Sequence, residues 1–395
     1  MPAADPHDPP DLADPVALAS ALIACPSVTP VEAGALDLME GWLRTLGFET
    51  ARLPSGPVDN LWAVRGSANG EGEGEGEGPR LCLAGHTDVV PPGPADAWTT
   101  EPFAPVRREG HLQGRGAADM KGALGAMVAA VARAGDDAPA LAFLITGDEE
   151  GQAVHGTKAA LAEIERRGGA FDACLVGEPT NPETLGTMMK VGRRGSCNAE
   201  LRVEGVQGHV AYPHLSQNPV PRLTAALAAL AAPLDEGYPR FQPSNLEVTQ
   251  LTTAEGAENV IPAWAQARFN VRFNPNWTGD ALVAELERRI GEAVGAEGWS
   301  LTPRVSGEAF LTEDETLMGI VADAAEAVTG HRPEPSTTGG TSDARFLSRH
   351  APTVEFGLVG ATMHQANERA ALADIEALTE IYVRVLRGYG QAGRA

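Results

Sequence analysis

The chain has 395 residues, 43% of them hydrophobic, and its 53 acidic against 30 basic side chains give a formal net charge of −23 at pH 7. This length allows two domains, each large enough to bury a core of its own. The negative charge argues against nucleic acid or an anionic membrane as a partner, because both would be repelled.

The N-terminal residues 1–15 carry acids and prolines where an export signal would carry basic residues and an apolar run. No apolar stretch of the sequence reaches the length that spans a membrane. None of the four cysteines has CxxC spacing, and Cys82 and Cys174 lie in apolar runs where a thiol behaves as a small hydrophobic side chain. We therefore expect a reduced, cytoplasmic protein with no membrane partner.

Helical and strand-like segments alternate through the first half of the chain. The patterns predict helices over 14–24, 33–46, 119–134 and 157–167, and strands over 61–64, 80–84, 140–146 and 171–176. Alternation with nearly continuous apolar strands is typical of an α/β sheet covered by helices on both faces. The Gly/Glu repeat over 70–78 cannot pack a core, and it predicts a surface loop.

The pattern changes near residue 194. Strands are predicted over 197–204, 245–252, 263–272 and 299–306, with helices over 219–231 and 279–294. This β-α-β-β-α-β order is typical of a ferredoxin-like unit. A helix over 317–328 and a strand over 353–356 then resume the first pattern. We predict a catalytic domain of residues 1–193 and 308–395, interrupted by a lid or dimerisation domain of residues 194–307.

Potential metal ligands recur just after apolar runs or glycine turns. They are His86, Asp119, Glu150, Glu178 and His364, with a spare carboxylate, Glu149, beside one of them. In open α/β sheets, ligands bind at the carboxyl ends of strands, where these residues are predicted to lie. Imidazoles and carboxylates together with one free base are what a two-metal hydrolase needs. Such ligands suit zinc, cobalt or manganese better than copper or iron–sulfur clusters.

Each fragment taken alone has a simpler interpretation. His86 and Asp88 can form a ligand with its orienting carboxylate, but a histidine at a strand end is more often structural. Asp119, in the turn GRGAADMKG, is equally suited to capping a helix. The acids of ITGDEEG could form a solvated turn, although at the mouth of a buried strand they repel one another unless cations compensate. Five such fragments in one chain favour a metal site.

The motifs HTDVVP, GRGAADMKG, ITGDEEG and LVGEPTNP, with the late histidine, resemble the co-catalytic zinc aminoacylase and carboxypeptidase family over essentially the whole chain. The resemblance implies a zinc-exopeptidase-like mixed sheet flanked by helices, with an inserted ferredoxin-like domain. It also implies two zinc ions per subunit, for which cobalt can substitute. Within the family, the stretches GVQGHVAYPHLSQNP and GGTSDARF are closest to enzymes that remove a succinyl group from a diamino diacid.

The resemblance assigns roles to the motif residues. Asp119 would bridge the two ions, His86 and Glu178 would complete one site, and Glu150 and His364 the other. Glu149 would be the general base, and Asp88 would orient His86.

The inserted domain carries further candidates. By resemblance, His209 would stabilise the oxyanion in the site of a partner subunit, which implies a homodimer; a structural turn histidine is the alternative. Other candidate contacts to a small N-acyl amino acid are Arg193, Arg194, Ser196, Tyr212, Asn259, Arg272, Gly340 and Thr341. Guanidinium groups suit a substrate with several carboxylates, although surface arginines are usually only solvated. The Gly339–Ser342 loop could present N–H groups to a carboxylate, or it could be a helix-entry turn capped by Ser342 or Asp343.

One departure concerns specificity. Some succinyl-removing members carry Asn-Ser-Thr before the late histidine, where this chain has Gly360, Ala361 and Thr362. Three alternatives therefore remain. One is a related acetylornithine deacetylase or aminoacylase, another is a dipeptidase, and the most distant is a binding protein on the same fold.

Overall fold

The computed structural model describes residues 11–66 and 79–393, so the Gly/Glu repeat lies outside the described residues. The chain forms two compact units: unit 1 is Met1–Val191, Thr312–Ser336 and Ser342–Ala395, and unit 2 is Gly192–Leu311 and Thr337–Thr341. The prediction placed residues 337–341 in the other domain. They belong to unit 2 because Arg193 Nη1 donates to the carbonyl of Gly340 at 3.0 Å and the Thr337 hydroxyl donates to the carbonyl of Arg240.

Unit 1 is built on a mixed sheet, as predicted, and within the described residues this sheet has eight strands. Its strand order is β1 (Glu49–Arg52), β2 (Leu61–Arg65), β6 (Leu141–Thr146), β3 (Leu81–His86), β7 (Ala173–Val176), β18 (Thr353–Glu355), β8 (Met188–Lys190) and β17 (Glu334–Ser336). The central strands β6, β3, β7 and β18 are mutually parallel. Every residue of β3 and β6 is buried, which explains their continuous apolar sequences.

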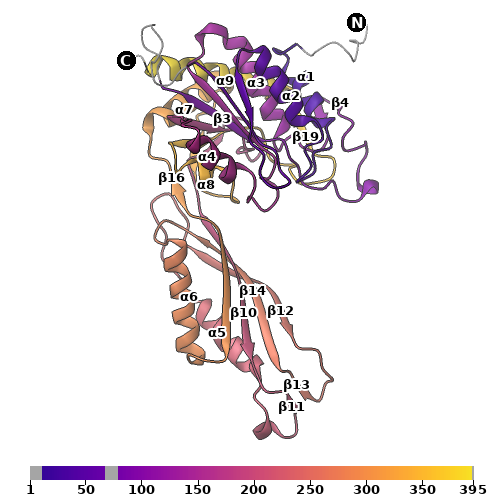
Figure 1. Cartoon of the computed structure of the whole chain (residues 1–395), viewed down its shortest axis with the longest axis vertical. Coiled ribbons are helices and arrows are strands. Elements are labelled where there is room, and N and C mark those ends of the chain that lie inside the picture. Colours follow the sequence, from indigo (N-terminus) through magenta and orange to yellow (C-terminus); the bar gives the residue numbers. More distant parts are fainter. Residues whose placement is uncertain (1–10, 67–78, 394–395) are drawn as a thin grey trace. The chain divides into compact units, whose positions relative to one another are not determined.

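Helices cover this sheet in two groups. The first contains α1 (Pro15–Ile23), α3 (Lys121–Ala134), α7 (Glu315–Thr329) and α9 (Leu372–Ala392), and the second contains α4 (Thr157–Arg166) and α8 (Ala344–Leu347). Figure 1 shows α3 and α9 on one side of β3, with α4 and α8 on the other. Helix α2 (Ala35–Thr45) packs on β1 and β2. The Asp14 carboxylate caps α1 by accepting from Val16 and Ala17 N–H, and Pro15 stands at the first helical position.

The topology brings the candidate ligands to one edge of the sheet. Strand β3 ends at His86, β6 leads into Glu149 and Glu150, and β7 ends two residues before Glu178. A small sheet of β4 (Val106–Arg108), β5 (His111–Gln113) and β19 (Arg369–Ala371) joins the remaining two segments. Because β5 precedes the turn to Asp119 and β19 follows the loop of His364, their antiparallel pairing brings these loops together.

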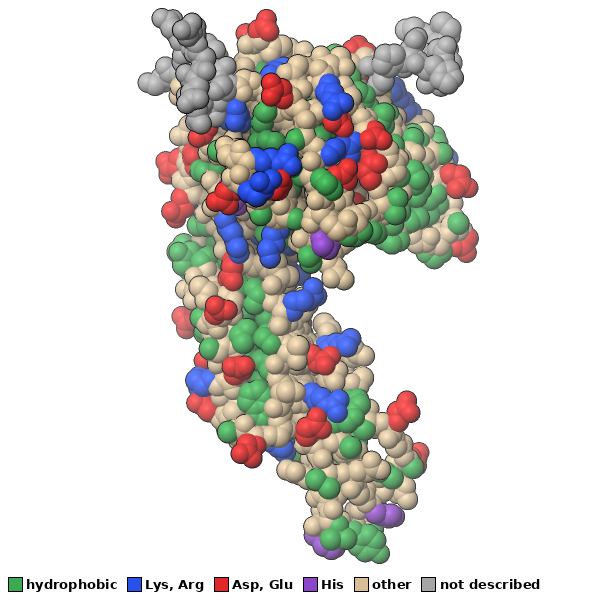
Figure 2. All heavy atoms as spheres, viewed as in Figure 1, with side chains coloured by type: hydrophobic (Ala, Val, Ile, Leu, Met, Phe, Trp, Pro, Cys, Tyr) green, Lys and Arg blue, Asp and Glu red, His purple; other side chains and the backbone are tan. Residues whose placement is uncertain are grey.

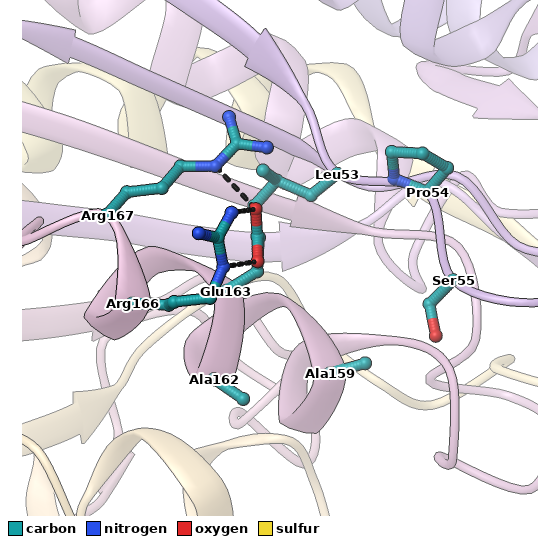
Figure 3. A pocket seen from close by; sticks show the side chains of 8 residues that line it. All are labelled: Leu53, Pro54, Ser55, Ala159, Ala162, Glu163, Arg166 and Arg167. Atoms are coloured by element: carbon teal, nitrogen blue, oxygen red, sulfur yellow. Dashed lines mark hydrogen bonds and ion pairs between the residues drawn. The ribbon is translucent and has the colours of Figure 1, made fainter.

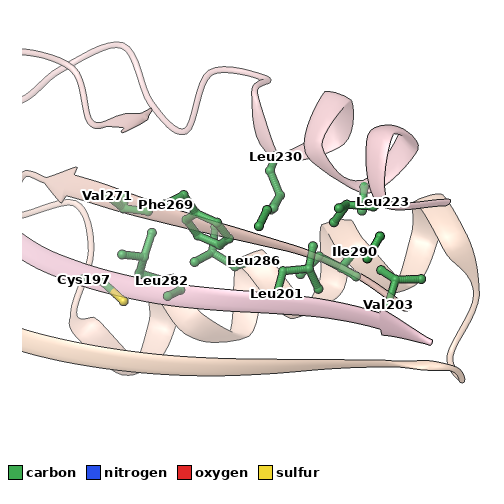
Figure 4. Close-up of a cluster of buried hydrophobic side chains, with 14 of the residues drawn as sticks. Cys197, Leu201, Val203, Leu223, Leu230, Phe269, Val271, Leu282, Leu286 and Ile290 are labelled. Carbon is green, nitrogen blue, oxygen red and sulfur yellow. The ribbon is translucent and has the colours of Figure 1, made fainter. Parts of the chain in front are cut away.

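Unit 2 has the predicted β-α-β-β-α-β order. Its sheet order is β12 (Asn245–Thr253), β14 (Trp264–Phe273), β10 (Gly195–Glu204) and β15 (Trp299–Gly307), with helices α5 (Pro219–Leu230) and α6 (Gly279–Val294). Alternate residues of β10 are buried, and they pack on Leu282, Leu286 and Ile290, which recur every fourth residue of α6 (Figure 4). Two short ribbons complete the unit: β9 (Gly192–Arg193) with β16 (Phe310–Leu311), and β11 (Gly208–His209) with β13 (Val260–Ile261).

The short 3-10 helices are η1 (Ala95–Ala97), η2 (Gly135–Asp137) and η3 (Pro213–Leu215). All four cysteines are free, as predicted, and three of them are buried. Among the helices within 11–66 and 79–393, none combines the length and the apolar character needed to cross a membrane.

Candidate metal centre

Four side chains of unit 1 converge around the carboxylate of Asp119. Its Oδ1 lies 3.2 Å from Nε2 of His86, and its Oδ2 lies 3.3 Å from Nε2 of His364. Glu178 Oε1 is 3.7 Å from the first imidazole, and Glu150 Oε1 is 2.9 Å from the second. The structure therefore brings together all five ligands predicted from the sequence, in two groups that share one aspartate.

The donor atoms have the spacing that zinc-like ions require. Within each group, one ligand atom per residue lies within 4.8 Å of the others. Nitrogen and oxygen ligands bind zinc at about 2.0–2.2 Å, so two ligands of a tetrahedral ion lie about 3.4 Å apart. The distances from Nε2 of His86 to its two carboxylate partners, 3.2 and 3.7 Å, bracket this value. One carboxylate with an oxygen in each group also suits a bridging role.

The conformations of Asp119 and His364 argue against the simpler interpretations. The residue that caps α3 is Met120, and no side chain makes a cap bond there, so Asp119 does not serve as a helix cap. His364 has φ of 61°, in the left-handed region that is unfavourable for a residue with a Cβ. Such backbone strain persists where the surrounding structure imposes it, and it is concentrated at functional sites.

The charges at this centre perturb one another strongly. Burial lowers the pKa of His86, but its bonds to Asp119 and Asp88 and the charge of Glu178 raise that pKa well above its ordinary value. Hydrogen bonds with Asp119 and Glu150 raise the pKa of His364 to about 10. Burial raises the pKa of Asp119, yet the two histidines hold it below the ordinary range. The raised pKa values of the two imidazoles favour their protonated forms, which offset part of the negative charge of the carboxylates.

Glu149 lies beside the ligands but in a different environment. Its pKa is raised well above the ordinary value, first by burial and then by the charge of Glu178. It also has a carboxylate oxygen within 4.8 Å of ligand atoms of His86 and Glu150. A carboxyl group whose pKa is shifted toward neutrality can accept and return protons near physiological pH.

Asp88 lies beneath this loop, 1% exposed. The sequence predicted that its carboxylate orients His86, and Oδ1 lies 3.5 Å from Nδ1 of that ring. The shorter contact of Nδ1, at 2.8 Å, is with the main-chain oxygen of Asp88. The carboxylate also accepts from the backbone N–H groups of Glu149 at 3.3 Å and Glu150 at 3.1 Å, and from the Thr29 hydroxyl at 2.6 Å. Sequence reasoning missed Thr29, because nothing near it in the chain points to the site.

The remaining predicted site residues lie in unit 2. His209 is exposed; its ring lies 5.7 Å from that of Tyr212, and Val210 N–H donates to the carbonyl of Asn259. Ser196 and Arg272 are directly opposite on β10 and β14. Arg193 is buried, and Arg194 donates to Asn245 at 2.8 Å.

The Gly339–Ser342 loop differs from one of its predicted forms, the helix-entry turn capped by Ser342 or Asp343. The carbonyl of Gly340 accepts from Arg193, and the Ser342 hydroxyl donates to Glu355. Asp343 begins α8 without a side-chain cap bond. Within the described part of the chain, neither Ser342 nor Asp343 is recorded as capping that helix through its side chain.

Two cavities of unit 1 lie near or beyond this centre. One of about 520 Å³ adjoins Glu150 and is also lined by Pro30, Val58 and His155. Another, of about 480 Å³, lies between the Leu53–Ser55 segment and α4. There Glu163 pairs with Arg166 of its own helix and with Arg167 directly after it (Figure 3), so its charge is already balanced.

Comparison with known proteins agrees with this geometry. The model of the family described as peptidase family M20/M25/M40 matches residues 82–388. A succinyl-diaminopimelate desuccinylase of Maricaulis maris is 53% identical over 390 residues, which cover 96% of each chain. The corresponding protein of Rhodospirillum rubrum is 51% identical over 96% of this chain and all of its own.

Solved structures share the fold at low sequence identity. The aminopeptidase PepT of Bacillus cereus superposes with a TM-score of 0.77 at 18% identity, covering 96% of this chain and 99% of its own. The YXEP protein of Bacillus subtilis, described as a dinuclear metal-binding peptidase of the M20 family, gives 0.68 at 14% identity, covering 97% and 98%.

Proposed function

This chain belongs to peptidase family M20/M25/M40, and we propose that it is a two-metal amide hydrolase that converts N-succinyl-LL-2,6-diaminopimelate and water to succinate and LL-2,6-diaminopimelate. This reaction is a step in bacterial synthesis of diaminopimelate and lysine. The observation that carries the proposal is the carboxylate of Asp119, whose two oxygens face two separate groups of ligands. The relatives that are more than half identical over nearly the whole chain support the choice of substrate.

Two zinc ions would be held by this set, one by His86, Asp119 and Glu178 and the other by Asp119, Glu150 and His364. Cobalt has compatible ligand preferences. When bound, such ions polarise the scissile carbonyl and lower the pKa of a coordinated water. The nitrogen and oxygen donor set and its spacing support this assignment.

Glu149 would be the general base. A water molecule attacks the succinyl carbonyl carbon while a carboxylate oxygen of Glu149 takes its proton. As the C–N bond breaks, protonated Glu149 returns that proton to the leaving nitrogen, which departs as the free amine. The burial of Glu149 and the neighbouring charge of Glu178 favour the protonated form and thus help Glu149 to hold the proton between these steps.

Unit 2 would recognise the substrate and join two subunits. Arginines Arg193 and Arg272 suit the substrate carboxylates, with Ser196, Gly340 and Thr341 as neighbouring contacts. His209, with Tyr212 and Asn259, would reach the oxyanion in the partner subunit of a homodimer. Apolar and histidine side chains gather near β11 and β13 (Figure 2), where Val206, Val210, Tyr212 and Leu215 are between 47% and 70% exposed. An interface would cover these groups. The free cysteines agree with a cytoplasmic location.

The test is an initial-rate comparison on zinc-loaded protein. We expect strong preference for N-succinyl-LL-diaminopimelate over N-acetylornithine, which would show that Gly360 and Ala361 are compatible with the succinylated substrate. Preference for acetylornithine would move the assignment to a related deacylase. In the same assay, Glu149→Gln should retain metal and lose about 10²- to 10⁴-fold in kcat. Unchanged turnover would refute the role of Glu149.

A further inference from the structure

Glu368 is a buried carboxylate at the edge of the metal centre that binds no candidate ligand side chain. It is 1% exposed, and it accepts four hydrogen bonds from one loop. Its Oε2 accepts from Arg115 Nη1 at 2.7 Å and from the backbone N–H of Gly116 at 2.9 Å. Its Oε1 accepts from the backbone N–H groups of Ala118 at 2.9 Å and Asp119 at 3.0 Å. The loop between β5 and α3 therefore wraps around this carboxylate.

These bonds connect two candidate ligands that are far apart in the sequence. One of them is made by the backbone N–H of Asp119 itself, and Glu368 stands four residues after His364. The guanidinium of Arg115 also donates to the carbonyl of Gln365, at 3.2 Å. Glu368 and Arg115 thereby fix the backbone of Asp119 relative to the loop that carries His364, where the two side chains meet at 3.3 Å.

The buried ion pair of Arg115 and Glu368 is better explained by positioning of the loop than by stability. Such a pair adds little to stability, because removing both charges from water costs about as much as their attraction returns. A carboxylate does, however, have enough lone pairs to accept all four donors, which an amide or an apolar group has not. This difference points to positioning of the loop as the reason for an acid at residue 368.

We propose that Glu368 is a positioning residue that sets the geometry of the bridging carboxylate and thereby the metal affinity of the centre. The inference rests on the proposed function and adds a residue that touches neither metal nor substrate. In Glu368→Gln, one carboxylate oxygen becomes an NH₂ group, so two of the four donors lose their acceptor. Loss of a partner that orients a ligand typically costs about 10- to 100-fold in metal affinity.

The experiment is a Co²⁺ titration of metal-free full-length protein, followed by visible absorption, for wild type, Glu368→Gln and Glu368→Asp. A matched control is Glu40→Gln in α2, because Glu40 also accepts bonds from two arginines and a hydroxyl but contacts no candidate ligand. We expect affinity about 10- to 100-fold lower for Glu368→Gln, an intermediate loss for Glu368→Asp and wild-type affinity for Glu40→Gln. The kcat should fall with little change in KM, because Glu368 does not contact substrate.

The outcomes separate the inference from the function on which it rests. A wild-type protein that binds no Co²⁺ would overturn the proposed function. Normal binding by wild type together with wild-type affinity in folded Glu368→Gln would overturn the inference alone. If Glu368→Gln does not fold, the same comparison is decided by Glu368→Asp, which keeps the charge but is one methylene shorter. An equal loss of affinity in Glu40→Gln would also overturn it, since the effect would then follow the loss of any carboxylate that accepts several hydrogen bonds.

Discussion

Replacing Asp88 by asparagine tests how this carboxylate acts on the centre. The main-chain oxygen of Asp88 contacts Nδ1 of His86 at 2.8 Å, and Asp88→Asn leaves that contact in place. The side chain instead has Thr29 and the backbone N–H groups of Glu149 and Glu150 as partners, besides a 3.5 Å contact with the ring. We therefore expect the change to displace the loop that carries Glu149 and Glu150 more than it reorients the ring of His86.

The size of the effect of Asp88→Asn follows from the number of hydrogen-bond donors that its carboxylate serves. Of the three hydrogen-bond donors on the carboxylate, Thr29 and Glu150 share one oxygen and Glu149 uses the other, so an amide loses at most two bonds. Each is worth about 1.5–3 kcal/mol, which gives an upper bound of about 3–6 kcal/mol for the loop. A misplacement of about 1 Å at a reacting group can cost about 100-fold in rate. We expect kcat at saturating Co²⁺ to fall at least 10-fold in Asp88→Asn.

The assay measures kcat, KM and Co²⁺ affinity for Asp88→Asn and for Thr29→Val. The second variant removes only the 2.6 Å hydroxyl bond, so it should give a smaller loss in the same direction. Wild-type kcat at saturating metal in Asp88→Asn, with metal affinity alone reduced, would refute this reasoning. It would mean that Asp88 acts through His86, as the sequence first indicated.

Three further changes test other parts of the molecule. In metal-free protein the two carboxylates beside His364 raise its pKa to about 10, whereas a metal ion binds the neutral ring, so below pH 10 the Zn²⁺ affinity should rise about tenfold per pH unit for one displaced proton. Calorimetry in two buffers of different ionisation enthalpy should detect the released proton, and Zn²⁺ binding without proton release would contradict this prediction. In Gly357→Ala the new Cβ would stand 2.3 and 2.4 Å from two backbone carbonyl oxygens, one of them that of Glu178, so we expect a loss of about 1–3 kcal/mol in unfolding free energy and a reduced metal content. The control Gly319→Ala, where nothing lies within 4 Å of the new Cβ, should lose neither. Phe269→Ala empties part of the unit 2 core and should cost about 3–5 kcal/mol in urea unfolding while metal affinity is unchanged; a matching loss of affinity would show that the centre depends on that core.

The candidate ligands were predictable because each follows a recognisable local pattern. His86 ends a buried strand, Glu178 follows another by two residues, and Asp119 stands in a glycine-rich turn before a helix. The carboxyl ends of parallel strands lie at the same edge of a sheet, so residues there can be predicted to lie close together before any distance is known. The alternating burial of β10 and the period of α6 likewise made the ferredoxin-like unit predictable.

Other features depend on partners far along the chain. Arg115 and Glu368 are 253 residues apart in the sequence, and Thr29 and Asp88 are 59 residues apart, so no local sequence pattern predicts either contact. Short strands such as β8 and β17 are three residues each and exist through their pairing with each other. Residues 337–341 belong to unit 2 for the same reason: the Gly340 carbonyl and the Thr337 hydroxyl have their hydrogen-bond partners, Arg193 and Arg240, in that unit.

For the two adjacent acids Glu149 and Glu150, the structure adds a physical reason to the roles that the family resemblance implies. Their order after one strand does not by itself say which is the base and which the ligand. In the structure Glu150 contacts an imidazole at 2.9 Å, whereas Glu149 is half-buried, and its desolvation followed by the charge of Glu178 raises its pKa. Opposite charge suits a carboxylate that stays ionised on a cation, and like charge suits one that must take up a proton. The environment of each carboxylate therefore supports the proposed assignment of base and ligand, since both side chains have the same chemistry.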